Sequence, residues 1–550
     1  WDVDTGRNIK WTGALGSQSY GNPVVAGGLV IVGTNNEAKR NPAFTDDAGV
    51  LMFFRESDGK YLWQHLRPKL PAGRVNDWPY QGICASPLVE GDYLWYATSR
   101  CEVIAMDISP LRDGKGEPKI LWNLDMMKEL GVFPHNMTSS SMLGFEELIF
   151  VITGNGVDDT HKNVPAPKAP SIIAVEKKTG KVVWSDNAPG PNIYHGTWAS
   201  PALAIIKGRP AVIAPLGDSW VYCYDARTGK LIWKFDTNQK HTIYPSTRNE
   251  LISTPVIVGD RMYIANGQDP EHGEGPGHFW CVDITGEGDV SLELPPDDLG
   301  PAAGELVVPA EQAKGRRGKP NPNSRVVWHY SAIDENKDGR IQIRERVNRS
   351  ISNALVVDDL VYLPDFSGMF HCFDAKTGQR HWVYDMEAAM WGSPTYIDGK
   401  IYLGDEDGDL VIFEHGREPK VLATHNMGSA IYSSPVFANG VLYIMNRSPS
   451  FRRVLESKYR ERAINSHLRS VPLFEVIRED PERFESFVNH LRERVKLIRF
   501  EPGDVILRQG AAADDGLFLV RTGHVKITQA RGEDEVVLNY VGPGGYIGEI

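Results

Sequence analysis

The chain has 550 residues, a formal net charge of −12 at pH 7 and 41% hydrophobic residues. This length exceeds an ordinary single domain unless structural repeats are present. The acidic balance argues against nucleic acid as the partner of the visible chain. The five cysteines form no CxxC or metal-like spacing, so we expect no disulfide framework. No run of 18 apolar residues occurs, so we predict no membrane span.

A short phrase recurs along the chain: a turn followed by a strand that ends in tryptophan. It reads DVDTGRNIKW, RESDGKYLW, EKKTGKVVW, DARTGKLIW and DAKTGQRHW at residues 2–11, 55–63, 176–184, 225–233 and 374–382. The Thr-Gly or Asp-Gly pair predicts the turn, because glycine tolerates positive φ. The alternating residues that follow predict a strand with the tryptophan on its buried face.

A second phrase contains a small residue, a proline, a strand, a Gly or Asp turn and another strand. Clear copies are NPVVAGGLVIVG, SPLVEGDYLWYA, TPVIVGDRMYIA, SPTYIDGKIYLG and SPVFANGVLYIM. With weaker copies near Ser140, Ser200 and Ser352, eight copies lie between Gly21 and Met445. A spacing of about 40–60 residues predicts one propeller blade per copy. We therefore expect a mostly β fold, an eight-bladed β-propeller over residues 1–448, in which residues 2–11 form an outer strand that completes the last blade.

These two phrases resemble the PQQ-type (quinoprotein-like) β-propeller repeat family, which includes quinoprotein dehydrogenases and non-catalytic scaffold propellers. A PQQ-dependent enzyme of this family needs a quinone site, a divalent metal and an Asp base. The chain lacks the adjacent cysteine pair of the larger alcohol dehydrogenases. Asn155, in ITGNGVDD, falls where those enzymes place an amide ligand to the metal, but we favour a simple Gly-Asn-Gly turn that leaves a strand. We can assign no base and no quinone-stacking pair, so we favour a binding or scaffold propeller with a protein partner.

An insertion at 284–325 is rich in Pro, Gly and charge, which predicts an exposed loop. DENKDGRIQIRE, at 334–345, then fits the calcium loop of an EF-hand. The predicted calcium ligands are Asp334, Asn336, Asp338, the backbone carbonyl of Arg340, Gln342 and Glu345, with Gly339 at the sharp turn and Ile341 as an apolar anchor. The flanks predict no paired EF-hand, so we expect either a lone structural calcium clip or a solvated Asp/Asn turn.

The composition changes after Ser448, which predicts a helical linker at 449–465 and a second domain at 466–550. Phe500 to Gly510, Phe518 to Ile527 and Gly544 to Glu549 carry three glycine patterns in order. They resemble the cyclic nucleotide-binding domain (catabolite activator or protein kinase A regulatory type), a helix plus a β-roll, here incomplete at its C-terminus. The resemblance implies that Gly548 and Glu549 begin the site for a nucleotide such as cAMP, with Glu549 accepting a hydrogen bond from the ribose 2′-hydroxyl. The phosphate-binding Arg of the family would lie beyond Ile550.

Three functional hypotheses follow. The first is a non-catalytic regulatory protein, bacterial in type, in which a propeller platform is coupled to a cyclic nucleotide sensor. The alternative is a PQQ-dependent dehydrogenase with an accessory domain. The third is that the two parts do not belong together, because the expected third strand of the last blade is replaced by PSFRRVLES. The propeller suggests export and the nucleotide domain suggests the cytoplasm, so we assign no location.

Overall fold

A computed structural model describes residues 5–447 except 270, 271, 273, 274, 296–317 and 340. Of the C-terminal part it describes 483, 486–487, 505–507, 518–519, 525–531, 534–541 and 546–547. The chain divides into two compact units, Trp1–Pro449 and Ser450–Ile550. No helix among these described residues is long and apolar enough to cross a membrane.

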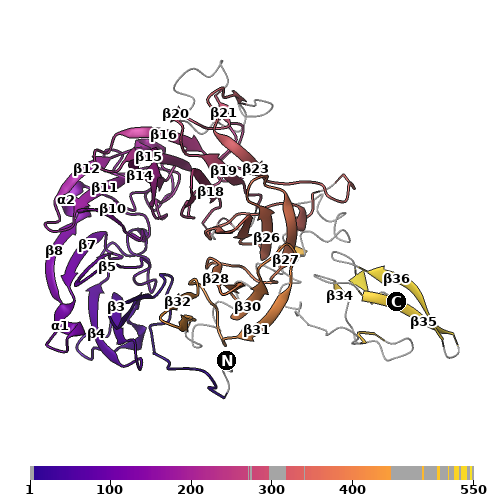
Figure 1. The fold of residues 1–550 in the computed structure, drawn as a ribbon, viewed down its shortest axis with the longest axis horizontal. Helices are drawn as coiled ribbons and strands as arrows, with labels where there is room; N and C mark the ends of the chain where they lie inside the picture. The colour runs from indigo at the N-terminus through magenta and orange to yellow at the C-terminus, as the bar shows by residue number, and fades with distance from the viewer. Residues whose placement is uncertain are drawn as a thin grey trace. The chain divides into compact units, whose positions relative to one another are not determined.

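The first unit is a β-propeller whose sheets follow one another around a ring in chain order (Figure 1). The first three sheets contain β1 (Val24–Ala26), β2 (Leu29–Asn35), β3 (Ala48–Arg55) and β4 (Tyr61–Pro68); β5 (Leu88–Glu90), β6 (Tyr93–Ala97), β7 (Glu102–Asp107) and β8 (Lys119–Asp125); and β9 (Leu143–Phe145), β10 (Leu148–Ile152), β11 (Ile172–Glu176) and β12 (Val182–Asp186). Two short helices, α1 (Ser109–Arg112) and α2 (Met126–Leu130), flank β8.

The next two sheets contain β13 (Ala202–Ile206), β14 (Arg209–Pro215), β15 (Trp220–Asp225), β16 (Leu231–Asp236) and β20 (Gly288–Asp289); and β17 (Val256–Val258), β18 (Arg261–Ala265), β19 (Phe279–Asp283) and β23 (Val326–Tyr330). The last three contain β24 (Leu355–Val357), β25 (Leu360–Pro364), β26 (Met369–Asp374) and β27 (Arg380–Asp385); β28 (Thr395–Ile397), β29 (Lys400–Gly404), β30 (Asp409–Glu414) and β31 (Val421–Asn426); and β32 (Val436–Ala438) with β33 (Val441–Tyr443). Within the insertion, β21 (Glu293–Leu294) pairs with β22 (Lys319–Pro320).

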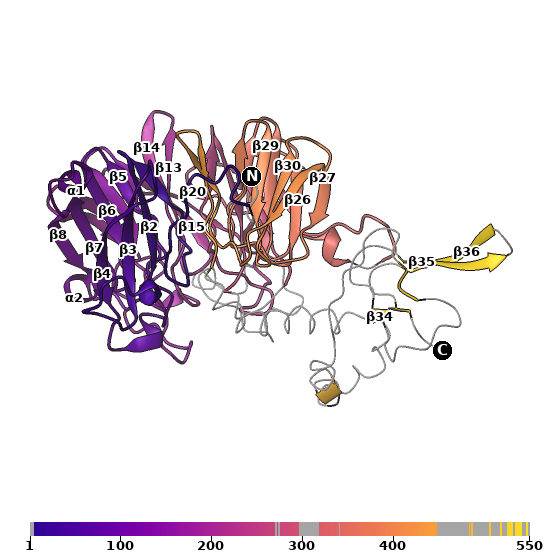
Figure 2. The ribbon, with the colours of Figure 1, turned by 90° about the horizontal axis from the view of Figure 1, so that it is seen from below.

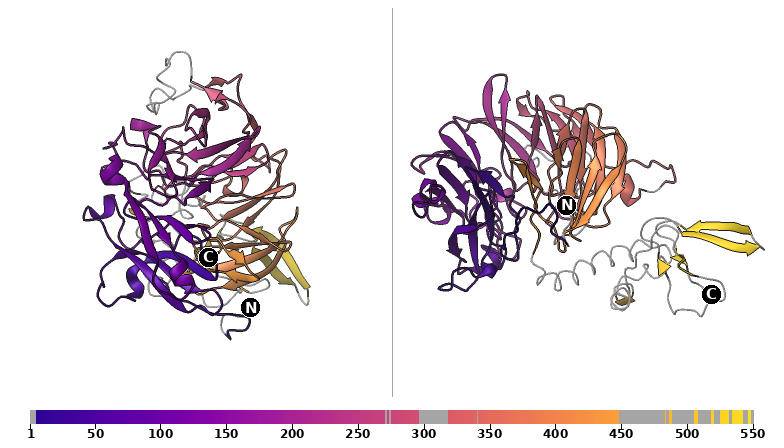
Figure 3. Two further views of the ribbon diagram at one scale, coloured as in Figure 1. Left: turned by 60° about the vertical axis from the view of Figure 1, so that its left-hand side comes forward. Right: turned by 60° about the horizontal axis from the view of Figure 1, so that its bottom comes forward.

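The eight sheets correspond to the eight predicted repeats, and the last has two strands in the described part of the chain. The number of complete blades therefore stays a prediction. Within each four-stranded set, neighbouring strands are antiparallel, so their connections alternate between the two sides of the ring. Loops that join second to third strands, and loops that join one sheet to the next, leave on the same side. We call this side the connection face (Figures 2 and 3).

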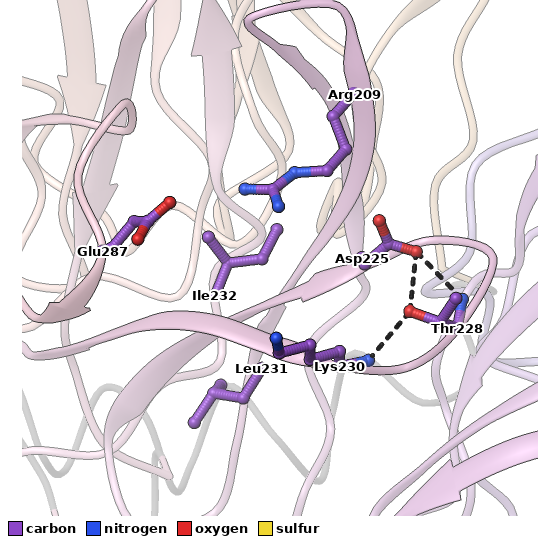
Figure 4. Close-up of a pocket in the computed structure, with 7 residues that line it drawn as sticks. All are labelled: Arg209, Asp225, Thr228, Lys230, Leu231, Ile232 and Glu287. Atoms are coloured by element: carbon purple, nitrogen blue, oxygen red, sulfur yellow. Dashed lines mark hydrogen bonds between the residues drawn. The ribbon is translucent and has the colours of Figure 1, made fainter.

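The recurring Thr-Gly turn has a defined hydrogen-bond pattern on the other side of the ring. After β15, Asp225 Oδ1 accepts hydrogen bonds from the backbone N of Thr228 at 3.0 Å and from its Oγ1 at 2.8 Å (Figure 4). The backbone N of Gly229, at φ +70°, donates to the carbonyl oxygen of Asp225 at 2.9 Å. The Asp and Thr side chains thus hold the turn, and glycine supplies its left-handed residue.

Tryptophans connect one sheet to the next. Four of them end a copy of the phrase, and two, Trp122 and Trp328, lie on β8 and β23. In each case the indole N–H donates to a backbone carbonyl at the turn of the following sheet, at 2.9–3.2 Å: Trp11 to Glu56, Trp122 to Lys177, Trp184 to Ala226, Trp233 to Ile284, Trp328 to Ala375 and Trp382 to Gly416. In four of these pairs the ring also covers the turn glycine so closely that a Cβ there would lie 2.4–2.8 Å from it: Gly59, Gly180, Gly229 and Gly378. The predicted burial of these tryptophans thus occurs between sheets.

Trp11 makes this contact across the closure of the ring. Its indole donates to the carbonyl of Glu56, in the first sheet, and its ring centroid lies 5.9 Å from that of Tyr443, on β33. Residues 5–11 form no strand, however, so the predicted outer strand is wrong for this described part. The segment adds one anchored side chain to the packing of the first sheet against the last, and it lacks the paired backbone that would make it a strand.

In the C-terminal unit, β34 (Phe518–Leu519) pairs with β37 (Tyr546–Ile547), and β35 (Val525–Arg531) pairs with β36 (Asp534–Val541). Both pairs are antiparallel, in agreement with the strands expected there. The linker predicted at 449–465 lies outside the described residues.

The packing of tryptophan on glycine gives a stability prediction. Gly378 and Gly399 have φ of +71° and +73°, but only a Cβ at Gly378 would meet a ring, that of Trp328 at 2.6 Å. Alanine at either position costs roughly 1–2 kcal/mol of backbone strain. We expect Gly378→Ala to lower the free energy of unfolding by about 1–3 kcal/mol more than Gly399→Ala, because it also overpacks the sheet interface. Urea unfolding followed by tryptophan fluorescence measures both; equal losses would contradict the packing argument.

Candidate metal centre on the connection face

Five potential metal-binding side chains meet on the connection face. His135 lies between β8 and β9, His161 between β10 and β11, and His195 between β12 and β13. Glu250 lies between β16 and β17, and His272 between β18 and β19. All five connections leave the ring on the same side, so the topology brings together residues that are far apart in sequence.

A glycine lets two of the histidine loops approach each other. A Cβ at Gly156 would lie 2.5 Å from Cβ of His135 and 2.6 Å from the carbonyl oxygen of His195. The backbone of Val157 donates to that same carbonyl at 2.9 Å. The NGV sequence at 155–157 thus joins the His135 and His195 loops through the backbone.

The tautomer of His135 is determined by its surroundings. Its Nδ1 lies 2.8 Å from the carbonyl oxygen of Val157. A carbonyl only accepts hydrogen bonds, so Nδ1 carries the proton and the lone pair lies on Nε2. This Nε2 is buried and has no hydrogen-bond partner among the described residues. An oriented, buried nitrogen lone pair of this kind is the usual state of a metal-binding histidine.

Glu250 brings a negative charge to the same place. Its side chain is 4% exposed, and its Oε1 accepts a hydrogen bond from the Tyr244 hydroxyl at 2.7 Å. The same oxygen lies 3.5 Å from Nδ1 of His195 and 3.7 Å from Nδ1 of His272. Its Oε2 is buried without a hydrogen-bond partner in the described part of the chain. Tyr244 therefore orients a carboxylate that retains a free oxygen.

The donor atoms converge in two groups. One donor from each of His135, His161 and His195 lies within 4.8 Å of the others, and the same holds for His195, Glu250 and His272. The rings of His135 and His161 have centroids 4.4 and 4.7 Å from that of His195. His161 is exposed and His272 is partly exposed, so solvent reaches the cluster from their side.

Burial favours the neutral form of two of the imidazoles, those of His135 and His272. Burial, and then the neighbouring His195, lower the pKa of His135 to about 3. Burial also lowers the pKa of His272. Burial alone would raise the pKa of Glu250, but its contacts with His195 and Tyr244 bring that pKa below its ordinary value. Neutral imidazoles and an ionised carboxylate are the forms that bind metal, and nitrogen-rich sets suit zinc, copper, iron or nickel more than calcium.

The predicted calcium loop forms a compact hydrogen-bonded turn. Asp334 accepts from the backbone N of Asp338 at 3.2 Å and of Gly339 at 2.9 Å. Glu345, 6% exposed, accepts from the backbone N of Glu335, Asn336 and Gln342 at 2.9–3.2 Å. Asn336 Nδ2 and Gln342 Nε2 both donate to Asp338 Oδ2, at 3.0 and 3.3 Å.

The loop differs from the prediction in its apolar residue. Ile341, the expected anchor, is 46% exposed. Arg340, the expected carbonyl ligand, lies outside the described residues. Calcium binding by this loop stays a prediction.

Other predicted site residues have different outcomes. The side chain of Asn155 is fully engaged: Oδ1 accepts from the backbone N of Phe133 and Nδ2 donates to the carbonyl of Ala166, both at 3.0 Å. It therefore supports the turn beside the cluster. Gly548 and Glu549 lie outside the described residues.

None of the five clustered residues was predicted from the sequence to form a site. Three of them follow recognisable strands of neighbouring repeats, so a comparison of the loops on one side of the ring could have selected them. A pocket lies at a Thr-Gly turn on the opposite side of the ring (Figure 4). It is lined by Arg209, Asp225, Thr228, Lys230, Leu231, Ile232 and Glu287.

Three curated proteins are similar to parts of the chain. Tetrathionate hydrolase of Acidithiobacillus ferrooxidans is 22% identical over 50% of this chain and 53% of its own length. The cAMP-dependent protein kinase type II regulatory subunit of Drosophila melanogaster is 27% identical over 28% of this chain and 38% of its own. Polyvinylalcohol dehydrogenase of a Sphingopyxis species is 28% identical over 20% of this chain and 18% of its own length. The chain thus spans about half or less of the length of these relatives.

Two family models match the chain. The model of the cyclic nucleotide-binding domain matches residues 497–550. The PQQ-type repeat model described as outer membrane protein assembly factor BamB matches residues 1–115, 138–295 and 301–451. Since these ranges cover most of its length, the chain belongs to this PQQ-type propeller family.

Proposed function

We propose that the propeller is a binding module that holds a divalent transition metal ion among His135, His161, His195, Glu250 and His272. The observation that carries this proposal is the buried Nε2 lone pair of His135, oriented by the Val157 carbonyl. A metal held by three protein ligands keeps coordination positions open. The metal would use such a position to bind a small ligand that enters from the side of the exposed His161.

The quinone alternative has support from a short match to a relative, the polyvinylalcohol dehydrogenase. The described residues fit it poorly, because both polar side-chain atoms of Asn155 are engaged and the clustered donors are mostly nitrogen. We therefore derive no step through a quinone. Reconstitution with PQQ and calcium separates the two functions: a quinone spectrum with dye reduction would favour the dehydrogenase. The protein partner expected for the propeller stays a prediction.

Metal content tests the proposal. We expect the purified full chain, dialysed against zinc, to retain at least one equivalent by mass spectrometry. His161→Gln removes an exposed ligand without disturbing the core, and we expect it to weaken zinc binding. Tyr244→Phe removes the hydrogen bond to Glu250, and we expect this variant to bind zinc about 10–100-fold more weakly. His425→Gln, on β31, is the matched control and should change nothing. Wild-type protein without metal, or variants that bind like the control, would overturn the proposal.

We propose a second activity for the C-terminal unit, binding of a cyclic nucleotide, on the match of residues 497–550. Glu549 would accept a hydrogen bond from the ribose 2′-hydroxyl. Such a charge-assisted hydrogen bond contributes about 1.5–3 kcal/mol. We expect Glu549→Ala to weaken the binding of cAMP about tenfold or more, as measured by calorimetric titration. Titration with 2′-deoxy-cAMP is the control: it should bind the wild type and Glu549→Ala equally. A Glu549→Ala loss that is the same for both ligands would contradict the assigned role.

We also propose that the loop at 334–345 binds calcium, with Glu345 as the bidentate ligand. Its carboxylate would exchange backbone hydrogen bonds for the ion. We expect calcium to raise the melting temperature of the wild type and of Glu335→Gln, a neighbouring acid outside the ligand pattern. Glu345→Gln should abolish the shift. An unchanged melting temperature in the wild type would show that the loop is a solvated turn.

A further inference from the structure

The five donors of the proposed metal site do not converge on one point. Metal–ligand bonds to imidazole or carboxylate are about 2.0–2.2 Å, so two donors on opposite sides of one ion are at most about 4.4 Å apart. Here the donor atoms lie within a comparable distance of one another, 4.8 Å, only inside each of two groups of three. The five donors do not form one such group. A single ion therefore uses one group and leaves two good ligands of the other group idle.

His195 belongs to both groups, and its ring has two nitrogens. Its Nδ1 is the nitrogen 3.5 Å from Oε1 of Glu250, so Nδ1 faces the group with Glu250 and His272. Nε2 would then serve the group with His135 and His161, whose rings lie beside that of His195. His195 is 1% exposed, and both of its nitrogens are buried. The ring of Trp198 packs against the ring of His195, with 4.9 Å between their centroids, and limits the rotation of the imidazole.

We propose that the cluster forms two adjoining metal positions bridged by His195, one completed by His135 and His161 and the other by Glu250 and His272. This inference rests on the proposed metal-binding function. A bridging imidazole must lose its remaining ring proton, which passes to solvent as the second ion binds. Each ion then has three protein ligands, three nitrogens in one position and two nitrogens and an oxygen in the other.

The charges indicate which ligand the pair would take. Two divalent ions carry four positive charges, and the His195 imidazolate and the Glu250 carboxylate offset two of them. The remaining charge favours an anion in the open coordination positions. The ligand class is therefore a small anion that reaches the metals past the exposed His161 and the partly exposed His272.

Copper(II) titration of the metal-free full chain tests the bridge, because electron spins couple through a shared imidazolate. We expect two ions per chain by mass spectrometry, with a paramagnetic resonance signal that rises with the first ion and falls with the second. His161→Gln should leave one uncoupled ion, in the position completed by Glu250 and His272. His272→Gln should also leave one uncoupled ion, in the position completed by His135 and His161. The control His425→Gln should retain two coupled ions, and melting temperatures verify that each variant is folded.

The alternatives are distinguishable. Two ions without spin coupling would overturn the bridge, and a single ion per chain would overturn the second position while leaving the proposed function intact. No bound ion in the wild type would overturn both.

Discussion

The contact of a tryptophan with the turn of the next sheet is the interaction on which the ring depends. A four-stranded sheet cannot bury both of its faces alone, so each must pack against two neighbours. The indole does this with a large apolar surface and one directed hydrogen bond, as Trp233 does with the carbonyl of Ile284. Trp11 makes the same contact from outside any strand. The first and last sheets also meet in an apolar cluster that includes Val30 and Tyr443, so the ring closes by side-chain packing although residues 5–11 form no strand.

This packing has a consequence for the connection face. Sheets held in a ring direct all of their inter-sheet loops to one side, so chemistry on those loops is concentrated there. His135 and His272 come from loops separated by several repeats, yet both belong to groups that include His195. Gly156 permits this approach because a side chain there would displace His135 or His195. The position of the histidines is thus set by sheet packing and by one glycine.

The parts of the structure that follow from local sequence could be predicted, and the parts that depend on several loops could not. The Thr-Gly turns and the strands after them depend on a few adjacent residues, and Asp225, Thr228 and Gly229 adopt the expected roles. The strand at residues 5–11 was wrong because the pattern predicts side-chain direction but not a pairing partner. The histidine cluster was missed because its distances depend on five separate loops. Asn155 drew attention by its local pattern, whereas its role is to support the loop beside that cluster.

The calcium-type loop and the histidine cluster show how satisfied and unsatisfied polar atoms separate a motif from a prepared site. The carboxylates of Asp334 and Glu345 accept backbone hydrogen bonds, so an ion would have to replace contacts that already hold the loop. Nε2 of His135 and Oε2 of Glu250 are buried without a partner in the described part of the chain, and burial of such atoms is costly. A bound metal would give these two atoms a partner, and at the Glu250 position it would replace the 3.5 Å contact between Glu250 and His195. By this criterion the propeller is preorganised for a transition metal on its connection face more than for calcium at residues 334–345.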